Sequence, residues 1–201
     1  MEKRDELYTG KAKSVFATDD PDKLVSLIED QLVRADLVVT SGGVSAGAYD
    51  VVKEVLSGLG TVTFDRVAMQ PGMPQGFGTI GESATPIFTL PGNPVSAFVS
   101  FEVFVRPAIR KMLGASRLHR PTGKAVLQST LRSPEGKRQF ARAQVEAARD
   151  GSHLARPMDA QGSHLLGDLA YANALIVVPE QVTEVAAGQI VDTVLIERPR
   201  E

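Results

Sequence analysis

The chain has 201 residues and a formal net charge of −2, so it lacks the concentrated basic face that nucleic-acid binding requires. It contains no cysteine, which excludes disulfides and thiolate metal sites, and no apolar run reaches the roughly 18 residues that a membrane helix needs. We therefore expect a cytoplasmic protein without nucleic-acid or membrane partners, built as one large domain or two small ones.

Helix and strand patterns alternate along the first part of the chain. Asp20 and Pro21 are typical of a helix start, and the apolar spacing that follows predicts a helix over residues 21–34. A strand at 37–40 leads through a glycine-rich turn into a second helix from about residue 48. Further β-rich segments precede a long apolar helix, and they lie at residues 61–69, 76–80 and 86–90. This alternation predicts an α/β sheet with helices on its faces.

The pattern changes beyond Gly114, which could end the long helix. Residues 115–123 are typical of a linker, and short strands separated by turn signals follow it. These predicted strands lie at residues 124–131, 138–147, 153–157, 174–178 and 190–196. We therefore expect a small β-barrel or sandwich after the α/β domain. The predicted domains are residues 1–116 and 117–201.

The glycine-rich turn is the first candidate for chemistry. Residues 40–47 read Thr-Ser-Gly-Gly-Val-Ser-Ala-Gly, between an apolar strand and a helix start. Free backbone N–H groups and the helix dipole favour an anion at such a place, although an ordinary βα connection fits the glycines equally well. Asp50 follows in the first helical turn. Its carboxylate could hold a magnesium ion against a phosphate, or could simply be stabilised by the helix dipole.

A second strand–turn–helix junction occupies residues 89–97. Asn93 is a favourable helix cap, and Pro94 suits the first helical turn. In open α/β folds such junctions converge at the carboxyl ends of the strands, where ligands bind. Asp19 and Asp20 form another carboxylate pair, for which helix capping is the simplest interpretation.

Three motifs follow one another along the chain: TSGGVSAGAYDVVKEVLSGLG, RVAMQPGMPQGFG and TLPGNPVSAFVSFEVFVRPAIRKMLG. Together they closely resemble the molybdopterin molybdotransferase family, which includes MoeA and the E domain of gephyrin. The resemblance continues through FARAQV and DAQGSHLLGDLAYANALIVVP and covers roughly residues 19–197. It implies a three-layer α/β/α molybdopterin-binding domain, truncated at its N-terminus, and a small C-terminal β-barrel domain.

The resemblance also implies an activity and its participants. Members of the family insert molybdate into adenylylated molybdopterin with Mg²⁺ or Zn²⁺, and they release AMP and molybdenum cofactor. A molybdopterin adenylyltransferase would supply the substrate, and the protein would form a homodimer. A non-catalytic pterin-binding or scaffold fragment remains an alternative, as does an unrelated phosphate-binding α/β protein.

Site residues follow from the resemblance position by position. The implied catalytic residues are Asp50, Asp20, Arg142 and Ser163, with Asp50 also the metal ligand. The implied substrate-binding residues are Ser41, Gly42, Gly43, Ser45, Gly47, Arg66, Pro91, Gly92, Asn93 and Pro94. Two of these have plain alternatives: Arg142 as a strand-edge arginine in solvent, and Ser163 as a helix cap.

The chain departs from the family pattern in two places. Gln70 and Met73 stand where the family often has lysines, and Arg66 replaces a further lysine while keeping the charge. Residues 1–13 also lack the strand and acidic turn with which the molybdopterin-binding domain normally opens. We therefore expect a C-terminal piece of the family's architecture, whose further acids lie in other segments.

Overall fold

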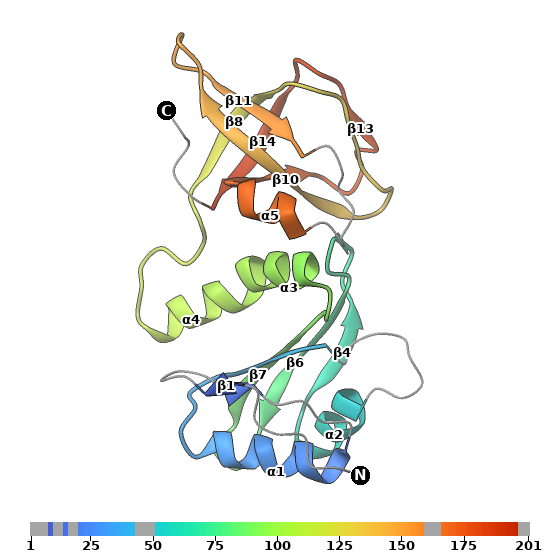
Figure 1. The fold of residues 1–201 in the computed structure, drawn as a ribbon, viewed down its shortest axis with the longest axis vertical. Coiled ribbons are helices and arrows are strands. Elements are labelled where there is room, and N and C mark those ends of the chain that lie inside the picture. Colours follow the sequence, from blue (N-terminus) through green and yellow to red (C-terminus); the bar gives the residue numbers. More distant parts are fainter. Residues whose placement is uncertain (1–7, 10–13, 16–19, 43–50, 159–165, 197–201) are drawn as a thin grey trace. The chain divides into compact units, whose positions relative to one another are not determined.

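The structure is a computed structural model that describes residues 8–9, 14–15, 20–42, 51–158 and 166–196 (Figure 1). Its contacts divide the chain into two compact units. The first unit comprises Met1–Phe64 and Gly76–Thr89, and the second comprises Asp65–Gln75 and Leu90–Glu201. Each unit contains its own buried clusters of apolar residues.

A four-stranded sheet forms the centre of the first unit, in the order β3-β7-β6-β4. Its strands are β3 (Val38–Ser41), β4 (Thr63–Arg66), β6 (Pro74–Ile80) and β7 (Thr85–Leu90). β6 and β7 pair antiparallel with Phe77 opposite Phe88. A separate pair, β1 (Tyr8–Thr9) and β2 (Ser14–Val15), is also antiparallel. The sheet confirms the strands that were predicted before each of the two turns.

Two helices, α1 (Pro21–Leu32) and α2 (Val51–Leu59), cover one face of this sheet (Figure 1). Their apolar residues pack with Ile80 and Ile87 of the strands in one core cluster, in which Leu56 is completely buried. α1 begins where the sequence predicts, because Asp20 caps it and Pro21 occupies its first position.

The second unit contains a β-barrel of five strands. Its order is β11-β8-β14-β12-β10, and it closes because β10 also pairs with β11. The strands are β8 (Thr122–Leu127), β10 (Arg138–Ala147), β11 (His153–Pro157), β12 (Ala174–Val178) and β14 (Ile190–Leu195). Alternate residues of β10 fill the interior, which closure removes from solvent. The barrel, rather than a sandwich, is therefore the fold of this region.

Smaller elements complete the second unit. β5 (Met69–Gln70) extends the barrel sheet by pairing parallel to β10. Its Gln70 lies opposite Gln139, which is 69 positions later in the sequence. β9 (Leu131–Arg132) and β13 (Glu184–Val185) form a two-stranded antiparallel sheet. A short helix, α5 (Leu166–Tyr171), precedes β12.

One long helical segment packs against the outside of the barrel. It consists of α3 (Pro94–Ser100), a π-helical segment η1 (Phe101–Val105) and α4 (Arg106–Met112). The Arg106 N–H donates to the Phe101 carbonyl, five residues back, which defines the π-type turn. Val99 packs with Met69 and with Leu175 of β12 in a core cluster of their own.

The predicted domain boundary near residue 117 does not coincide with the boundary between the compact units. The prediction assigns the helical segment 94–112 to the first domain, whereas its packing against Leu175 places it in the second unit. A boundary between independently folding domains at residue 117 stays a prediction. None of the helices within the described ranges is both long and apolar enough to span a membrane.

Candidate functional site

The first candidate turn begins at the end of β3. Ser41 is the last residue of the strand and is exposed, and Gly42 has a φ of 93°, which an L side chain rarely adopts. Four other predicted site residues lie outside the described residues: Gly43, Ser45, Gly47 and Asp50. The described chain resumes at Val51, where α2 begins. The strand–turn–helix order predicted for this segment is therefore confirmed at both of its ends.

The second candidate turn follows β7. Pro91 is buried, Gly92 is exposed and Pro94 is the first residue of α3. The Asn93 side chain caps this helix, because its Oδ1 accepts from Val95 N at 3.1 Å and Ser96 N at 3.2 Å. The capping role predicted for Asn93 is thus confirmed. Its role in substrate binding stays a prediction.

β3 and β7 are neighbours in the sheet, and they run in the same direction in Figure 1. The chain around β4 runs antiparallel to β6, since Gly60 bridges Ile80 in that sense and Thr61 N donates to the Thr79 carbonyl at 3.1 Å. β6 is antiparallel to β7, so β4 and β7 are parallel. Helix α2 connects β3 to β4, and a helical connection of this kind joins parallel strands. β3 is therefore parallel to β4, and so to β7. β3 and β7 therefore end at the same edge. Ser41 and Asn93 belong to different compact units, and the convergence of the two turns stays a prediction.

Asp20 acts as the cap of α1. Its Oδ1 accepts from Asp22 N at 3.1 Å and Lys23 N at 3.4 Å, and its Oδ2 lies 3.3 Å from Lys23 Nζ. The side-chain contact with Lys23, followed by the backbone hydrogen bonds, lowers the pKa of the Asp20 carboxyl below its ordinary value of 3.8. These contacts support the capping interpretation, whereas a catalytic role for Asp20 is still a prediction.

Arg142 lies on the outer face of the barrel, yet it is only 1% exposed. It is directly opposite Leu175, whose side chain packs against Val99 of α3, whereas the flanking Ala141 and Ala143 point into the barrel core. Arg142 therefore lies in the layer between the barrel and its covering helices. The alternative of a strand-edge arginine in solvent is wrong, because β10 has partners on both sides.

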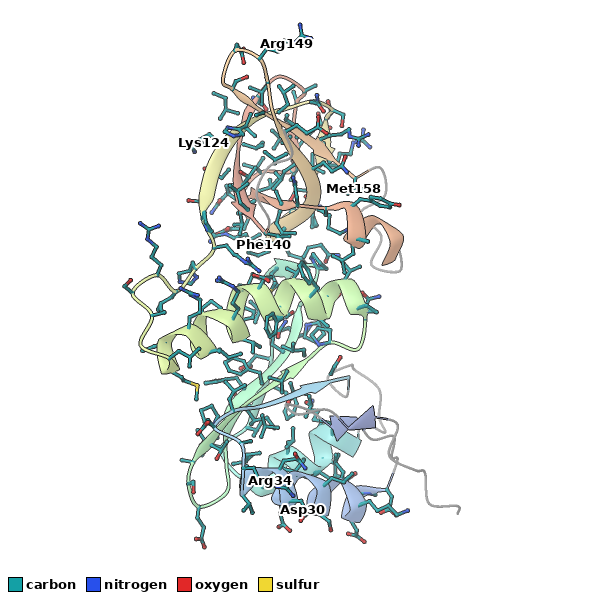
Figure 2. The ribbon with its side chains drawn as sticks, turned by 60° about the vertical axis from the view of Figure 1, so that its left-hand side comes forward. Asp30, Arg34, Lys124, Phe140, Arg149 and Met158 are labelled. Atoms are coloured by element: carbon teal, nitrogen blue, oxygen red, sulfur yellow. The ribbon has the colours of Figure 1, made fainter. Side chains whose placement is uncertain are left out.

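Figure 2 shows Phe140, two residues before Arg142, on the side of the barrel that faces the 94–112 helix. Phe140 belongs to the same cluster as Leu175. A guanidinium buried in such an apolar layer is a candidate for anion binding, because burial strengthens its interaction with an opposite charge. Ser163, the other predicted site residue of this unit, lies outside the described residues.

The turn with the lysine departures is held by the side chain of Gln75 in β6, which also contacts Ser100 of α3. Gly72 has a φ of 92°, and Gln75 Nε2 donates to both the Gly72 carbonyl and Ser100 Oγ at 2.5 Å. Arg66 is exposed at the end of β4. Its exposure is compatible with anion binding, which stays a prediction for this residue.

Sequence reasoning missed a buried ion pair between Glu102 and Arg120. Glu102 is 8% exposed, and its two carboxylate oxygens accept from Arg120 Nε and Nη2, each at 2.8 Å. Arg120 Nη1 also donates to the Ile196 carbonyl at 2.9 Å, and Arg106 Nε lies 3.8 Å from Glu102. A single acid in the apolar run Phe-Glu-Val-Phe-Val is the sequence signal that would have indicated a buried partner.

No group of three or more His, Asp or Glu side chains within the described ranges is placed to hold a metal ion. The family resemblance implies a metal site with fewer protein ligands, in which the substrate supplies the others. Magnesium is commonly held by one or two carboxylates together with substrate phosphates. Asp50 and a bound phosphate fit that donor set, and the metal stays a proposal.

Comparison with known proteins identifies the family. Residues 11–111 match the family described as a probable molybdopterin binding domain, and residues 124–196 match the MoeA C-terminal region, domain IV. The chain belongs to the MoeA-type molybdopterin molybdenumtransferase family. The predicted combination of an α/β molybdopterin-binding fold with a C-terminal β-barrel is confirmed.

Similar proteins agree with this assignment. Molybdopterin molybdenumtransferase 2 of Mycobacterium tuberculosis is 50% identical over 181 residues, covering 86% of this chain and 43% of the relative. Molybdopterin molybdenumtransferase of Haemophilus influenzae is 38% identical over 159 residues, covering 79% and 39% respectively. The crystal structure of a MoeA protein from Pyrococcus horikoshii matches with a TM-score of 0.72 and 29% identity, over 90% of this chain and 42% of that one. The chain thus spans less than half the length of these relatives.

Proposed function

We propose that this chain binds molybdopterin and carries out molybdate insertion in molybdenum cofactor biosynthesis. The observation that supports this most is that the glycine-rich sequence joins strand β3, the neighbour of β7, to helix α2 in a chain that matches both family domains. A glycine turn at a helix start suits a phosphate, since backbone N–H groups and the helix dipole both favour an anion there.

In the proposed reaction the substrates are adenylylated molybdopterin and molybdate, and AMP is released. The turn from Gly42 to Gly47 would bind the pterin phosphate, and Asp50 would hold Mg²⁺ or Zn²⁺, which neutralises phosphate charge. Arg142 would attract an oxyanion from its buried position, and Ser163 would supply a hydroxyl. These roles rest on the family resemblance together with the burial of Arg142.

A direct test is calorimetric titration of the chain with molybdopterin, with and without magnesium. It is followed by an assay of AMP release from adenylylated molybdopterin in the presence of molybdate. We expect binding together with AMP release. A folded sample that does not bind molybdopterin would refute the proposed function.

A second candidate is a non-catalytic pterin-binding or scaffold fragment. It is favoured by one observation: the chain covers 43% of the M. tuberculosis relative and 39% of the H. influenzae relative, so residues elsewhere in those proteins could supply catalytic acids. Binding of molybdopterin without AMP release would identify this function.

The role proposed for Asp50 has a separate test. We expect Asp50→Ala to abolish the magnesium dependence of molybdopterin binding and of AMP release, because the carboxylate that holds the ion is lost. The matched control is Asp36→Ala, which removes an exposed carboxylate near β3 and should leave both properties unchanged. An unchanged magnesium dependence in Asp50→Ala would contradict the assignment.

The proposed partners follow from the same family resemblance. We propose a cytoplasmic homodimer that receives its substrate from a molybdopterin adenylyltransferase. Sedimentation equilibrium would test the dimer. Transfer of adenylylated molybdopterin from the purified adenylyltransferase would test the donor.

A further inference from the structure

Positive charge is concentrated in the part of the second unit between Glu102 and Glu135. This stretch contains seven Lys or Arg residues and no Asp or Glu, although the net charge of the whole chain is −2. Four of the seven lie near a carboxylate, and they are Arg106, Arg120, Lys124 and Arg132. The other three are Arg110, Lys111 and Arg117. Among the residues that the structure describes, none of these three forms an ion pair.

These three cations gather at the end of α4. Arg110 and Lys111 belong to the last turn of the helix. Arg110 Nε donates to the Arg117 carbonyl at 2.5 Å, which ties residue 117 to that turn. Arg106 Nη1 donates to the Leu118 carbonyl at 3.1 Å, so the chain runs back along the helix that it has just left. Figure 1 shows this reversal before the chain continues to β8.

Two large apolar side chains are exposed among these cations. Met112 is 49% exposed and Leu113 is 78% exposed, at the point where α4 ends. Gly114 follows with a φ of 71°, and a Cβ placed there would meet no atom within 4 Å, so the turn projects into open space. Leu113 comes three residues after Arg110, which brings the two side chains to the same side of the helix. We call residues 110–117 the α4 tip.

The helix dipole explains only part of the α4 tip. The C-terminus of a helix favours cations, which accounts for Arg110 and Lys111. Arg117 lies beyond the helix, and the dipole gives no reason for an exposed methionine and leucine beside it. Adjacent exposed apolar side chains surrounded by charge of one sign are typical of a surface that meets a partner.

We propose that the α4 tip is a docking site for the surface of an anionic membrane. Met112 and Leu113 enter the headgroup layer, and Arg110, Lys111 and Arg117 attract the lipid phosphates. The contact is peripheral and reversible, and it needs no spanning helix. It departs from the expectation of no membrane partner, which depended on the lack of a long apolar run. It is also independent of the proposed function.

Two features favour a lipid surface over an acidic protein. The apolar pair lies on a projecting turn, so it is buried only by a partner that opens around it, and a fluid headgroup layer does so without a preformed pocket. The tip carries cations with no acid between them, whereas protein interfaces use complementary charges of both signs to fix their register. A lipid surface spreads its negative charge evenly and requires no register.

The test measures binding of the chain to lipid vesicles by cosedimentation. One set of vesicles contains phosphatidylcholine alone, and the other contains phosphatidylcholine and phosphatidylglycerol in equal parts. We expect binding to the anionic vesicles only, and weaker binding as the salt concentration rises, because salt screens exposed charges. A chain that does not bind the anionic vesicles at low salt would overturn the proposal.

Substitutions in the α4 tip separate its charge from its apolar surface. Lys111→Gln and Arg117→Gln should each weaken binding to anionic vesicles about fivefold, because each removes one cation from the membrane surface. Leu113→Ser should also weaken binding but leave its salt dependence unchanged, since no charge is lost. The matched control is Arg132→Gln, which removes an exposed cation that pairs with Glu184. It makes the same change in net charge and should leave vesicle binding unchanged. All four positions are exposed, so the melting temperature should stay the same in every variant.

The remaining outcomes identify what binds the tip. Equal losses in Arg117→Gln and Arg132→Gln would overturn the proposal, because net charge alone would then govern binding. Polyglutamate serves as the protein-like probe. Binding of polyglutamate that depends on Lys111 and Arg117, without binding to vesicles, would also overturn the proposal and indicate an acidic protein instead. The vesicle assay contains no molybdopterin, so a failure of the proposed function would leave its result unchanged.

Discussion

At the scale of single residues, the described positions fall into helix-capping groups and buried polar groups. Asp20 and Asn93 satisfy the first N–H groups of α1 and α3, a role that depends only on neighbours in sequence. Arg142 and Thr89 are buried on strands, and their surroundings come from distant segments. A cap can therefore be recognised in sequence, whereas the burial of a polar side chain cannot.

Replacing Asn93 separates its structural role from its proposed role in binding. We expect Asn93→Ala to lower the free energy of unfolding by about 1 kcal/mol, because the cap of α3 is lost. In a protein of this size that corresponds to a fall of about 2–4 °C in melting temperature. Urea denaturation and thermal unfolding would measure it.

Asn93→Asp is the informative control for that change. It retains the acceptor that caps Val95 and Ser96, so stability should be preserved, and its charge is favourable at a helix N-terminus. If Asn93 borders the anion site, the new carboxylate should weaken molybdopterin binding. Lost stability in Asn93→Asp would contradict the capping assignment.

The Asp20 carboxylate should make stability depend on pH in the acidic range. Its pKa is lower in the folded chain than the ordinary 3.8, chiefly through Lys23, so its contribution is fully present above the unfolded value. That contribution is lost as the pH falls through the lowered folded pKa. We expect Asp20→Ala to reduce the urea midpoint at neutral pH, and the difference to vanish below that pKa. A constant difference across the whole range would contradict this account.

At the scale of elements, the helix from Pro94 to Met112 depends on a contact that its sequence period does not reveal. Its π-helical segment carries Glu102 into a buried position, where Arg120 of the linker neutralises it. The same arginine donates to the Ile196 carbonyl just after β14. One ion pair thus connects a helix, the linker and the end of the last barrel strand.

Breaking this pair should destabilise the second unit. We expect Arg120→Met to cost about 3–5 kcal/mol, since it leaves the buried Glu102 carboxylate without its two-point partner. The double variant Glu102→Leu/Arg120→Met should regain most of that loss, because no buried charge remains without a partner. Equilibrium denaturation of the single and double variants would measure both values. A double variant no more stable than Arg120→Met would argue against a buried ion pair.

At the scale of the whole molecule, the buried clusters are separate. One cluster, which includes Leu56, lies in the first unit, and the two others lie in the second. A cavity removes packing contacts from the residues around it. A cavity made in one unit should therefore chiefly lower the stability of that unit.

Hydrogen exchange would test this division. We expect Leu56→Ala, which removes a completely buried side chain, to destabilise by about 2–5 kcal/mol and to speed exchange in α1, α2 and β7. Ile176→Ala, at an equally buried position of the barrel, should speed exchange in β10 and β12 instead. Equal loss of protection in both units from either variant would show that they unfold as one.

Much of the secondary structure could be predicted from local patterns. The bounds of β10, β11 and β12 coincide with those predicted, because each strand is bordered by turn residues. α5 was anticipated only through the alternative of Ser163 as a helix cap, because six residues are too few to establish a helical period. The addition of β5 to the barrel was missed because two residues carry almost no strand signal.

The sequence by itself determined the α/β-then-β order, the start of each capped helix and the family resemblance, because caps, turns and motifs depend on residues close together in the chain. Only the tertiary structure decided that the barrel closes through β10 and β11, that Arg142 is buried and that Glu102 pairs with Arg120. Each of these depends on strand register or on packing between distant segments, which no local pattern specifies.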